Sequence, residues 1–325
     1  MTSTVASVVL LTYNQAAFVQ EAFESLLNQD RDDIEIVVSD DCSSDSTWDV
    51  ILAVAQSYVG SKKLILSRNV SNLGIVDNYA AAVEQSTGEL IFMAAGDDIS
   101  MPDRCSKSIQ FWLDNQKKYD LVAADAIDMS LTGEALGRKD SIDLEKWTVE
   151  KWFKRRPFFF GASHMVTRKL LEIGPLDNNL PYEDQCLVFR AILMGGAVRL
   201  PIPLVKHRRG GMTQKNEFKV GHRRAEFIPS MRLEMLELQQ FLRDAISLNR
   251  RLMVDDLIKQ RMAYCNSVLT LFKSSTPIKS LFVFWGSPEV PVKDRYRYSR
   301  YILFYPVLAI AHVFRDGIRV LRGKA

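Results

Sequence analysis

Short apolar runs rich in β-branched residues alternate with helical patterns through the first third of the chain, and this alternation constrains the fold most. The runs predict strands over residues 7–12, 34–40, 64–67 and 89–94. The segments between them predict helices over residues 17–27, 47–58, 76–86 and 102–115, with Ser44 as an N-cap and Pro102 in a first turn. Strands that alternate with helices form βαβ units, so we expect a mostly parallel sheet.

The pattern becomes mixed beyond residue 120. Strands are predicted over residues 121–124, 158–166 and 198–205, and a helix over Glu183–Met194 that ends at two glycines. Beyond Glu217 the chain is predicted to be helical. A chain of 325 residues has room for two domains, and we expect an α/β domain over residues 1–215 followed by a helical region over 216–325.

The residues that follow the predicted parallel strands are the first candidates for a binding site, because open α/β sheets bind ligands at the carboxyl ends of their strands. These positions hold Tyr13 and Asn14, Asp40 and Asp41, Asn72, and Gly96 to Asp98. Neither G-x-G-x-x-G nor G-x-x-x-x-G-K-[ST] follows the first strand, which argues against a dinucleotide-binding domain and a P-loop NTPase.

The Asp97-Asp98 pair is a candidate metal site. Asp is favoured near helix N-termini, so a capping role is the alternative for both acidic doublets, although Ser100 and Pro102 already supply a helix start after Asp98. Mg²⁺ binds one or two carboxylates together with phosphate oxygens and water, and Mn²⁺ favours similar ligands. We expect the small Gly96 to leave room for a ligand, and the pair to hold a metal ion on a nucleotide diphosphate.

Five segments in this order carry a family pattern: SVVLLTYNQAAFVQEAFESLLNQ, IVVSDDCSSDST, NLG, GELIFMAAGDDISMPDR and FFFGASHMVTRKLLEIGPLDNNLPYEDQCLVFRAILMGG. Together they resemble glycosyltransferase family 2, inverting enzymes with the GT-A fold, and in particular the bacterial enzymes of cell-surface polysaccharide synthesis. The resemblance covers residues 5–215. It implies an αβα sandwich with a nucleotide-sugar half over residues 1–125 and an acceptor half over residues 126–215.

The resemblance also implies a role for each matching position. Tyr13 should lie against the nucleotide base and Asp41 should hydrogen-bond it, with Asn14 and Asn72 as further nucleotide-binding residues. Asp97 should contact the ribose or the metal, Asp98 should bind Mn²⁺ or Mg²⁺, Asp184 should be the general base, and Glu183 should lie on the acceptor side.

Departures from the family pattern leave the metal-ligand set open. Ala95 stands where many members have a further Asp, and Leu11 stands where Pro or Thr is frequent. The Q-x-x-R-W motif of processive synthases is absent, so we expect transfer of a single sugar.

A basic segment from Lys206 to Arg224 follows the last predicted strand of the acceptor half. We expect it to close over the diphosphate, with Arg208 and Arg209 as ligands, His207 as an additional metal ligand and two following glycines as a hinge. The alternative is a solvated basic loop.

The C-terminal 35 residues carry eight Lys or Arg and two Asp, so they hold the positive charge of a chain whose net charge is only +3. The uncharged stretch Tyr301–Phe314 is too short to span a bilayer, which takes about 20 residues, but its aromatic residues and basic flanks suit an anionic membrane surface. The alternative is a helix packed on the core or on another subunit. The basic patches come without a recognised nucleic-acid motif, so no nucleic acid is expected.

The resemblance therefore implies an inverting, metal-dependent transferase that takes a sugar from a UDP- or dTDP-linked donor to a saccharide or lipid-linked saccharide. Four scattered cysteines and the lack of a signal peptide favour a cytoplasmic protein at the inner face of the membrane. The oligomeric state is left open. The alternatives are a sugar-nucleotide nucleotidyltransferase and an inactive GT-A protein that acts as an assembly partner.

Overall fold

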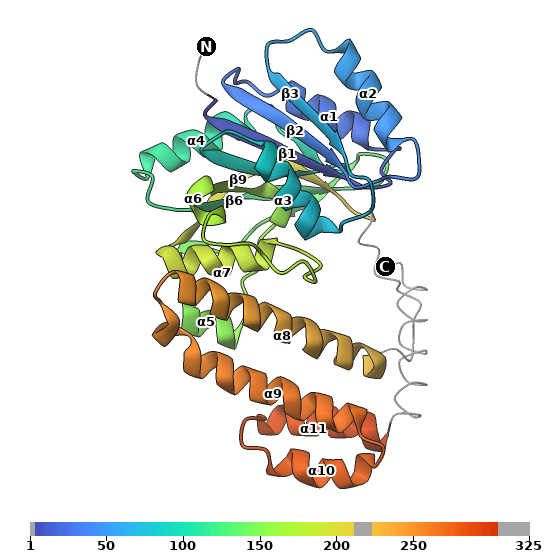
Figure 1. Ribbon diagram of the computed structural model, residues 1–325, viewed down its shortest axis with the longest axis vertical. Helices are drawn as coiled ribbons and strands as arrows, with labels where there is room; N and C mark the ends of the chain where they lie inside the picture. Colours follow the sequence, from blue (N-terminus) through green and yellow to red (C-terminus); the bar gives the residue numbers. More distant parts are fainter. Residues whose placement is uncertain (1–3, 211–222, 305–325) are drawn as a thin grey trace. The chain divides into compact units, whose positions relative to one another are not determined.

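The computed structural model describes residues 4–210 and 223–304, which form two compact units (Figure 1). The first comprises the chain up to Met212 together with Arg243–Arg251, and the second comprises Thr213–Leu242 and the chain from Leu252 onward. The strands are β1 (Ala6–Thr12), β2 (Ile34–Asp40), β3 (Lys63–Arg68), β4 (Leu90–Ala95), β5 (Ile99–Ser100), β6 (Leu121–Met129), β7 (Ala135–Lys139), β8 (His164–Thr167) and β9 (Ala197–Arg208). The helices of the first unit are α1 (Val19–Leu27), α2 (Thr47–Ser57), α3 (Ile75–Gln85), α4 (Arg104–Asp114), α5 (Val149–Lys154), α6 (Arg168–Leu171) and α7 (Asp184–Met194).

One mixed sheet runs through the first unit in the order β3-β2-β1-β4-β8-β6-β9-β5, with β7 paired to β6. The four strands β3, β2, β1 and β4 are parallel, as the alternating pattern predicts. The sheet then continues through β8, which is antiparallel to both β4 and β6. The fold class predicted from the sequence, an αβα sandwich of the GT-A type, is confirmed.

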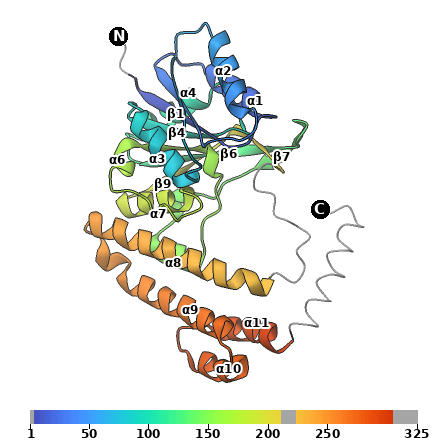
Figure 2. The same ribbon diagram turned by 45° about the vertical axis from the view of Figure 1, so that its right-hand side comes forward.

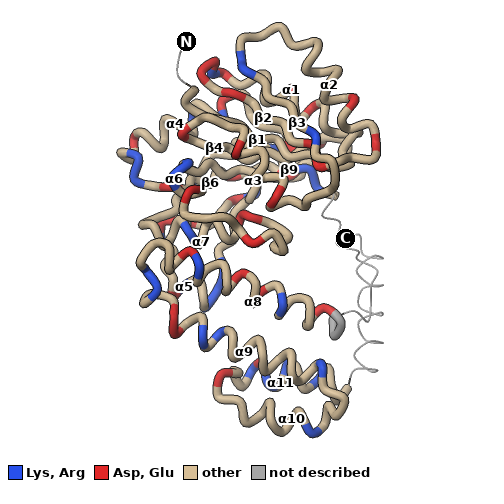
Figure 3. The backbone as a smooth tube through the Cα atoms, in the orientation of Figure 1, with Lys and Arg blue, Asp and Glu red and all other residues tan. Residues whose placement is uncertain are grey.

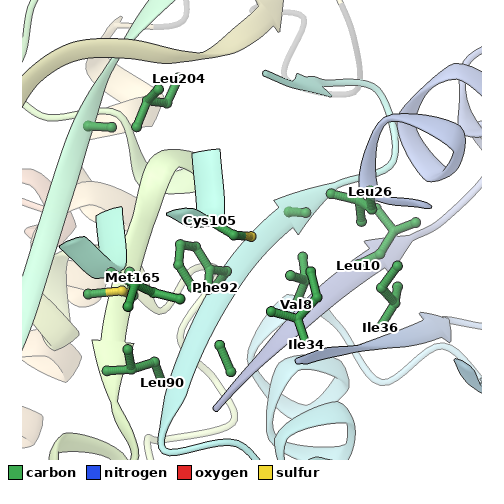
Figure 4. Close-up of a cluster of buried hydrophobic side chains, with 14 of the residues drawn as sticks. Val8, Leu10, Leu26, Ile34, Ile36, Leu90, Phe92, Cys105, Met165 and Leu204 are labelled. Atoms are coloured by element: carbon green, nitrogen blue, oxygen red, sulfur yellow. The ribbon is translucent and has the colours of Figure 1, made fainter. Parts of the chain in front are cut away.

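The strands β1 and β2 are buried along their whole length. Helices flank this part of the sheet on both faces (Figure 2). The even-numbered residues of the two strands, among them Val8, Leu10 and Ile36, share a core with α1, α2 and α4 (Figure 4). The opposite face packs against α3, where the Ser39 hydroxyl donates to Asn78. Because both faces are buried, the sequences of these strands are continuous apolar runs and do not alternate between apolar and polar residues.

The exact ends of several elements differ from the prediction. Ser46 occupies the N-cap position of α2 instead of Ser44, because the Asp45 carboxylate accepts the backbone N–H of Thr47. Helix α4 begins two residues after Pro102, since Arg104 N–H first closes a turn onto the Met101 carbonyl.

The acceptor half differs more. The strand predicted over residues 158–166 is only His164–Thr167, because Gly161–Ser163 form a 3₁₀ turn, while β6 extends five residues beyond the predicted end at Ala124.

A buried ion pair fixes α7 inside the first unit. The Arg190 guanidinium donates to both carboxylate oxygens of Asp244, at 3.0 and 2.8 Å, and to the Leu170 carbonyl at 3.2 Å. Both charged side chains are almost completely excluded from solvent. Asp244 lies on α8 (Arg223–Ser247), so a segment far along the sequence holds the helix that begins at Asp184.

Replacing Asp244 by Ala should lower the free energy of unfolding by about 3–5 kcal/mol, because it leaves the Arg190 charge buried without its carboxylate. The double replacement Arg190→Met with Asp244→Leu should recover most of this loss. Chemical denaturation measures both. The control is Arg243→Gln, which removes a half-exposed pair with Asp177 and should cost less than about 1 kcal/mol. If Asp244→Ala and Arg243→Gln lowered the free energy of unfolding by equal amounts, the prediction would be contradicted.

The second unit is helical, as predicted for the C-terminal region. It contains the first part of α8 with α9 (Asp255–Lys273), α10 (Pro277–Gly286) and α11 (Val292–Leu303). Phe227 stacks edge-on against Tyr298 and Tyr301 of α11, and the Tyr264 hydroxyl lies 3.1 Å from that of Tyr298. The aromatic residues of α11 therefore hold this unit together.

Candidate active site

The first part of the site lies where β1 and β4 end side by side in the parallel sheet, at the point where the strand order reverses. Tyr13 and Asn14 follow β1, and Gly96 to Asp98 follow β4. Asn14 has a left-handed backbone (φ 51°), which its side chain supports by accepting the N–H of Ser44 at 2.8 Å. The backbone N–H of Asn14 donates to the Ser43 hydroxyl at 2.9 Å, so the exits of β1 and β2 are joined.

Gly96 serves a different purpose from the one predicted. A Cβ at this position would lie 2.4 Å from Gln15 Oε1 and 2.9 Å from Thr12 Cγ2. The space beside Gly96 is therefore filled by the chain's own side chains, and the expectation that it leaves room for a ligand is wrong. The glycine lets the turn after β4 pack against the turn after β1.

The two members of the first acidic doublet have separate structural partners. Asp40 is fully buried and accepts the N–H of Ser43 at 3.0 Å. Asp41 accepts the backbone N–H groups of Leu73 and Gly74, at 2.8 and 2.9 Å. Asp41 thus holds the loop that carries the exposed Asn72, and it brings two of the predicted nucleotide-binding residues to one end of the sheet.

Asp98 is 8% exposed, and its Oδ1 accepts the backbone N–H of Arg208 at 2.9 Å. Burial, followed by the charge of neighbouring Asp97, raises the pKa of the Asp98 carboxyl to about 8. A bound cation would favour the ionised form of Asp98, because its positive charge would offset both the cost of burial and the repulsion by Asp97. The Asp97-Asp98 pair therefore suits a cation. Among the described residues there is no cluster of three or more His, Cys, Asp or Glu side chains placed to hold a metal, so a metal here would also need oxygens from a diphosphate or water.

Arg208 holds this acidic turn in place. It is the last residue of β9, is almost fully buried, and donates to the carbonyls of Asp97 (3.1 Å) and Leu131 (2.8 Å) and to the Glu21 carboxylate (2.7 Å). Its guanidinium also lies over the Phe18 ring, 4.6 Å from the centroid. These contacts give Arg208 a scaffolding role and do not favour the diphosphate-binding role predicted for it.

The predicted closing loop is also shorter than expected, because Lys206 to Arg208 belong to β9. Arg223 and Arg224 belong to α8, and residues 211–222 of the predicted loop lie outside the described residues. Its closure over a diphosphate stays a prediction.

His207 and Arg209 share the carboxylate of Asp128. His207 Nδ1 lies 2.8 Å from Asp128 Oδ1, and Arg209 Nε lies 2.7 Å from Oδ2. Hydrogen bonds from Arg209 and His207 lower the pKa of Asp128 despite its burial, so the carboxylate is ionised and acts only as an acceptor. Because this carboxylate can only accept, the contact places a proton on His207 Nδ1, so Nε2 is the ring nitrogen that remains for a metal ion.

Asp184 is joined to this region through a short turn. The His207 ring packs on Phe160, with centroids 4.6 Å apart, and Gly161 follows Phe160 in the chain. A Cβ on Gly161 would lie 2.6 Å from Asp184 Oδ2, so the turn passes directly against the carboxylate at the start of α7. The Glu183-Asp184 pair is thereby linked to β9, whose last residue, Arg208, contacts Asp98.

Glu183, predicted on the acceptor side, is buried. Burial and the adjacent Asp184 raise the pKa of the Glu183 carboxyl to about 8. This raised pKa favours the protonated form of Glu183 at neutral pH and so disfavours Glu183 as the base. Asp184, next to it in the chain, is half-buried.

Sequence reasoning missed the residues that join the two halves of the site: Asp128, Phe160, Gly161 and the structural role of Arg208. Gly161 directly follows three Phe residues, and a glycine at that position is a signal that another part of the chain packs closely there. Asp128 gave no such signal, because the predicted strand ended at Ala124, four residues before it.

The sheet has a parallel half that ends at Tyr13 and Asp97-Asp98 and a mixed half, in which β6 and β9 are parallel and β8 is antiparallel to β6. This arrangement defines the molecule as a GT-A-fold protein. Solved structures share this fold. TarS residues 1–349 from S. aureus in complex with UDP match with a TM-score of 0.57 at 18% identity, over 98% of this chain and 92% of that chain. The mannosyltransferase PcManGT from Pyrobaculum calidifontis, in complex with GDP-Man and Mn²⁺, matches with a TM-score of 0.51 at 16% identity, over 98% and 88%.

Sequence comparison gives the family. The profile of Glycosyl transferase family 2 matches residues 7–174, more than half of the chain. The succinoglycan biosynthesis protein ExoO of Rhizobium meliloti is 29% identical over 218 residues (62% of this chain, 60% of the relative), and the abequosyltransferase RfbV of Salmonella typhimurium is 33% identical over 107 residues (32% and 31%). The matches span less than two thirds of the length of these curated relatives. The chain belongs to glycosyltransferase family 2, as its motifs predicted.

Proposed function

We propose that the protein transfers one sugar from a nucleotide-sugar donor to an acceptor hydroxyl, with inversion at the anomeric carbon. The observation that carries this proposal is the connection between the two acidic pairs: Asp98 is bonded to Arg208 of β9, and Asp184 lies against the turn whose Phe160 packs on His207 of the same strand. Asp98 is thus available to bind the metal ion of the leaving diphosphate, and Asp184 is available to the attacking hydroxyl.

In this reaction the acceptor oxygen forms a bond to the anomeric carbon as the bond from that carbon to the diphosphate breaks. Asp184 accepts the proton of the attacking hydroxyl, and the nucleoside diphosphate leaves with the electron pair. Asp98 and Asp97 would hold Mn²⁺ or Mg²⁺ together with oxygens of the diphosphate or of water, and the charge of the ion would neutralise the leaving diphosphate. Single displacement needs no enzyme nucleophile.

The donor side of the proposal rests on Tyr13, Asn14, Asp41, Asn72 and Asp97, which follow neighbouring strands at one end of the sheet. We propose a UDP- or dTDP-linked donor and a saccharide or lipid-linked saccharide acceptor in surface polysaccharide synthesis. The complexes of TarS with UDP and of PcManGT with GDP-Man and Mn²⁺ support a nucleotide-sugar donor, and the similarity to the succinoglycan biosynthesis protein ExoO supports a role in polysaccharide synthesis.

A panel of donors tests the function. We expect the melting temperature of the full chain to rise with UDP-glucose, UDP-N-acetylglucosamine or dTDP-rhamnose in the presence of Mn²⁺, and this rise to disappear with EDTA. GDP-mannose serves as the purine comparison. NMR of the product made from the stabilising donor then reports the anomeric configuration. Release of pyrophosphate from a nucleoside triphosphate and a sugar 1-phosphate would instead identify a nucleotidyltransferase, and retained configuration would exclude inversion.

We also propose that the enzyme is cytoplasmic and that its C-terminal region, residues 216–325, brings it to an anionic membrane surface. No helix in the described part of the chain is both long enough and apolar enough to cross a bilayer. On α10, Ile278 and Phe282 are 66% and 78% exposed, and they share one side of the helix because they are four residues apart. Lys279 lies beside them in the chain, and α11 adds further cations (Figure 3). The predicted apolar stretch Tyr301–Phe314 lies outside the described residues except for its first four.

Replacing Phe282 by Ser should weaken binding to vesicles that contain phosphatidylserine, because it removes a large exposed apolar side chain from the proposed contact. Vesicle sedimentation at rising salt measures this, and the wild-type binding should fall as salt screens the lysines and arginines. The matched control is Val70→Ser, which replaces an exposed apolar residue of the first unit. Deleting α11 is a poorer test, because Tyr298 and Tyr301 hold the second unit together. Equal vesicle binding by both variants and the wild type would contradict the proposal.

A further inference from the structure

One ammonium group lies between two aromatic rings close to the proposed base. Lys139 Nζ is 5.4 Å from the ring centroid of Phe158 and 5.4 Å from that of Phe160. The backbone fixes both rings, since Ile142 N–H donates to the Phe158 carbonyl at 2.9 Å and Phe160 N–H to the Ser141 hydroxyl at 3.4 Å. Phe158 remains 46% exposed although it is a large apolar residue in a folded unit.

The charge of Lys139 is only weakly compensated. Its contact with Asp128 is 3.8 Å long, and Asp128 is already bonded to Arg209 and His207 at hydrogen-bonding distance. Two basic side chains, Lys139 and Arg209, share the one carboxylate of Asp128, so this cluster carries an excess positive charge. An exposed aromatic face beside a weakly compensated ammonium can bind a ligand that is both flat-faced and anionic.

The position of the cluster connects it to the reaction. Ala126, Phe160 and Val205 pack together on the face of β6 and β9 that also carries Asp128 and His207. Gly161, the next residue after Phe160, lies against Asp184. A molecule resting on the exposed ring of Phe158 would therefore lie close in the chain to the turn that packs against the carboxylate proposed to take the proton from the acceptor.

We propose that Phe158 and Lys139 form an acceptor subsite for a saccharide that carries an anionic group. The apolar C–H face of the sugar ring stacks on Phe158, and the anion binds the Lys139 ammonium. The anion is either the carboxylate of a uronic acid or the phosphate of a linked lipid or sugar, which share this chemistry. The inference rests on the proposed glycosyl transfer and adds the chemical class of the acceptor.

Binding of three probes tests the subsite: methyl β-glucuronide, glucose 1-phosphate and methyl β-glucoside, each measured by saturation-transfer NMR on the full chain with UDP and Mn²⁺ present. The wild type should prefer one of the charged probes to the neutral glucoside, and the preferred probe identifies the anion. Lys139→Gln should lower affinity for that probe about tenfold or more and leave the glucoside unchanged, as expected for loss of a charge-assisted contact of about 1.5–3 kcal/mol. Phe158→Ala should weaken all three, and Lys139→Arg should restore most of the preference.

The matched control is Lys118→Gln, which removes a similar cation–π contact, with Tyr119, at 5.1 Å on another part of the unit. Stabilisation by the nucleotide-sugar should be unchanged in all these variants, so failure of the subsite is distinguishable from failure of the proposed function. A wild type without preference for either charged probe, or a Lys139→Gln variant that keeps the preference, would overturn the proposal. In that case Lys139 only holds the 158–160 segment against β7.

Discussion

The Asp184→Asn variant should bind the nucleotide-sugar donor almost as tightly as the wild type while its kcat falls by about two to four orders of magnitude, the usual range for loss of a general base. The amide has the size of the carboxylate and can still accept the nearby N–H of Gln185, so the start of α7 should keep its conformation. It cannot accept the proton of an attacking hydroxyl. Donor affinity follows from the melting-temperature shift, and kcat follows from the release of nucleoside diphosphate at saturating donor.

Two further variants make this result specific. Glu172→Gln removes an exposed carboxylate on the segment before α7 and should leave kcat unchanged. Gly161→Ala should lower kcat less than Asp184→Asn does, because the new methyl group displaces the Asp184 carboxylate without removing it. If Asp184→Asn instead loses donor affinity and keeps its turnover at saturation, Asp184 belongs to the donor side and the assigned role is wrong.

The parallel half of the fold was predictable because its signals are local. The strands β1, β2 and β4 are buried apolar runs bounded by helical patterns, so both their existence and their neighbours follow from a few residues of sequence. The candidate residues at the strand ends followed in turn, since parallel strands direct their carboxyl ends to the same edge. The errors here were local: Ser46 rather than Ser44 precedes α2, and the space beside Gly96 is filled by Gln15 and Thr12.

The acceptor half was less predictable because residues distant in sequence determine it. Arg208 is bonded to Glu21, 187 positions earlier, and Arg190 is paired with Asp244, 54 positions later. A basic run before a Gly-Gly pair has the composition of a solvated loop, and only the carbonyls and the carboxylate that surround Arg208 show that it is buried in a strand. The turn at Gly161–Ser163 likewise interrupts an apolar run that reads as one strand.

The Asp98→Asn variant should keep the fold and lose metal-dependent donor binding. Its side-chain oxygen can still accept the N–H of Arg208, but a neutral amide does not supply the anionic ligand that Mn²⁺ or Mg²⁺ requires. At a donor concentration of about 100 times Kd, binding stabilises a protein by about 2.7 kcal/mol, so the wild type should show a clear rise in melting temperature with Mn²⁺. The variant should show the same small shift with Mn²⁺ as with EDTA.

The unliganded variant should itself be at least as stable as the wild type at neutral pH. The neutral amide removes the repulsion by Asp97 and the cost of burying a second charge, which are the two causes that raise the pKa of Asp98. Loss of donor binding without loss of unliganded stability therefore separates a ligand-binding carboxylate from a structural one. Asp114→Asn, at the exposed end of α4, is the matched control and should respond to Mn²⁺ and donor as the wild type does. Full donor affinity of Asp98→Asn in Mn²⁺ would show that this carboxylate does not bind the metal, because a ligand of such a buried site cannot be replaced by solvent without cost.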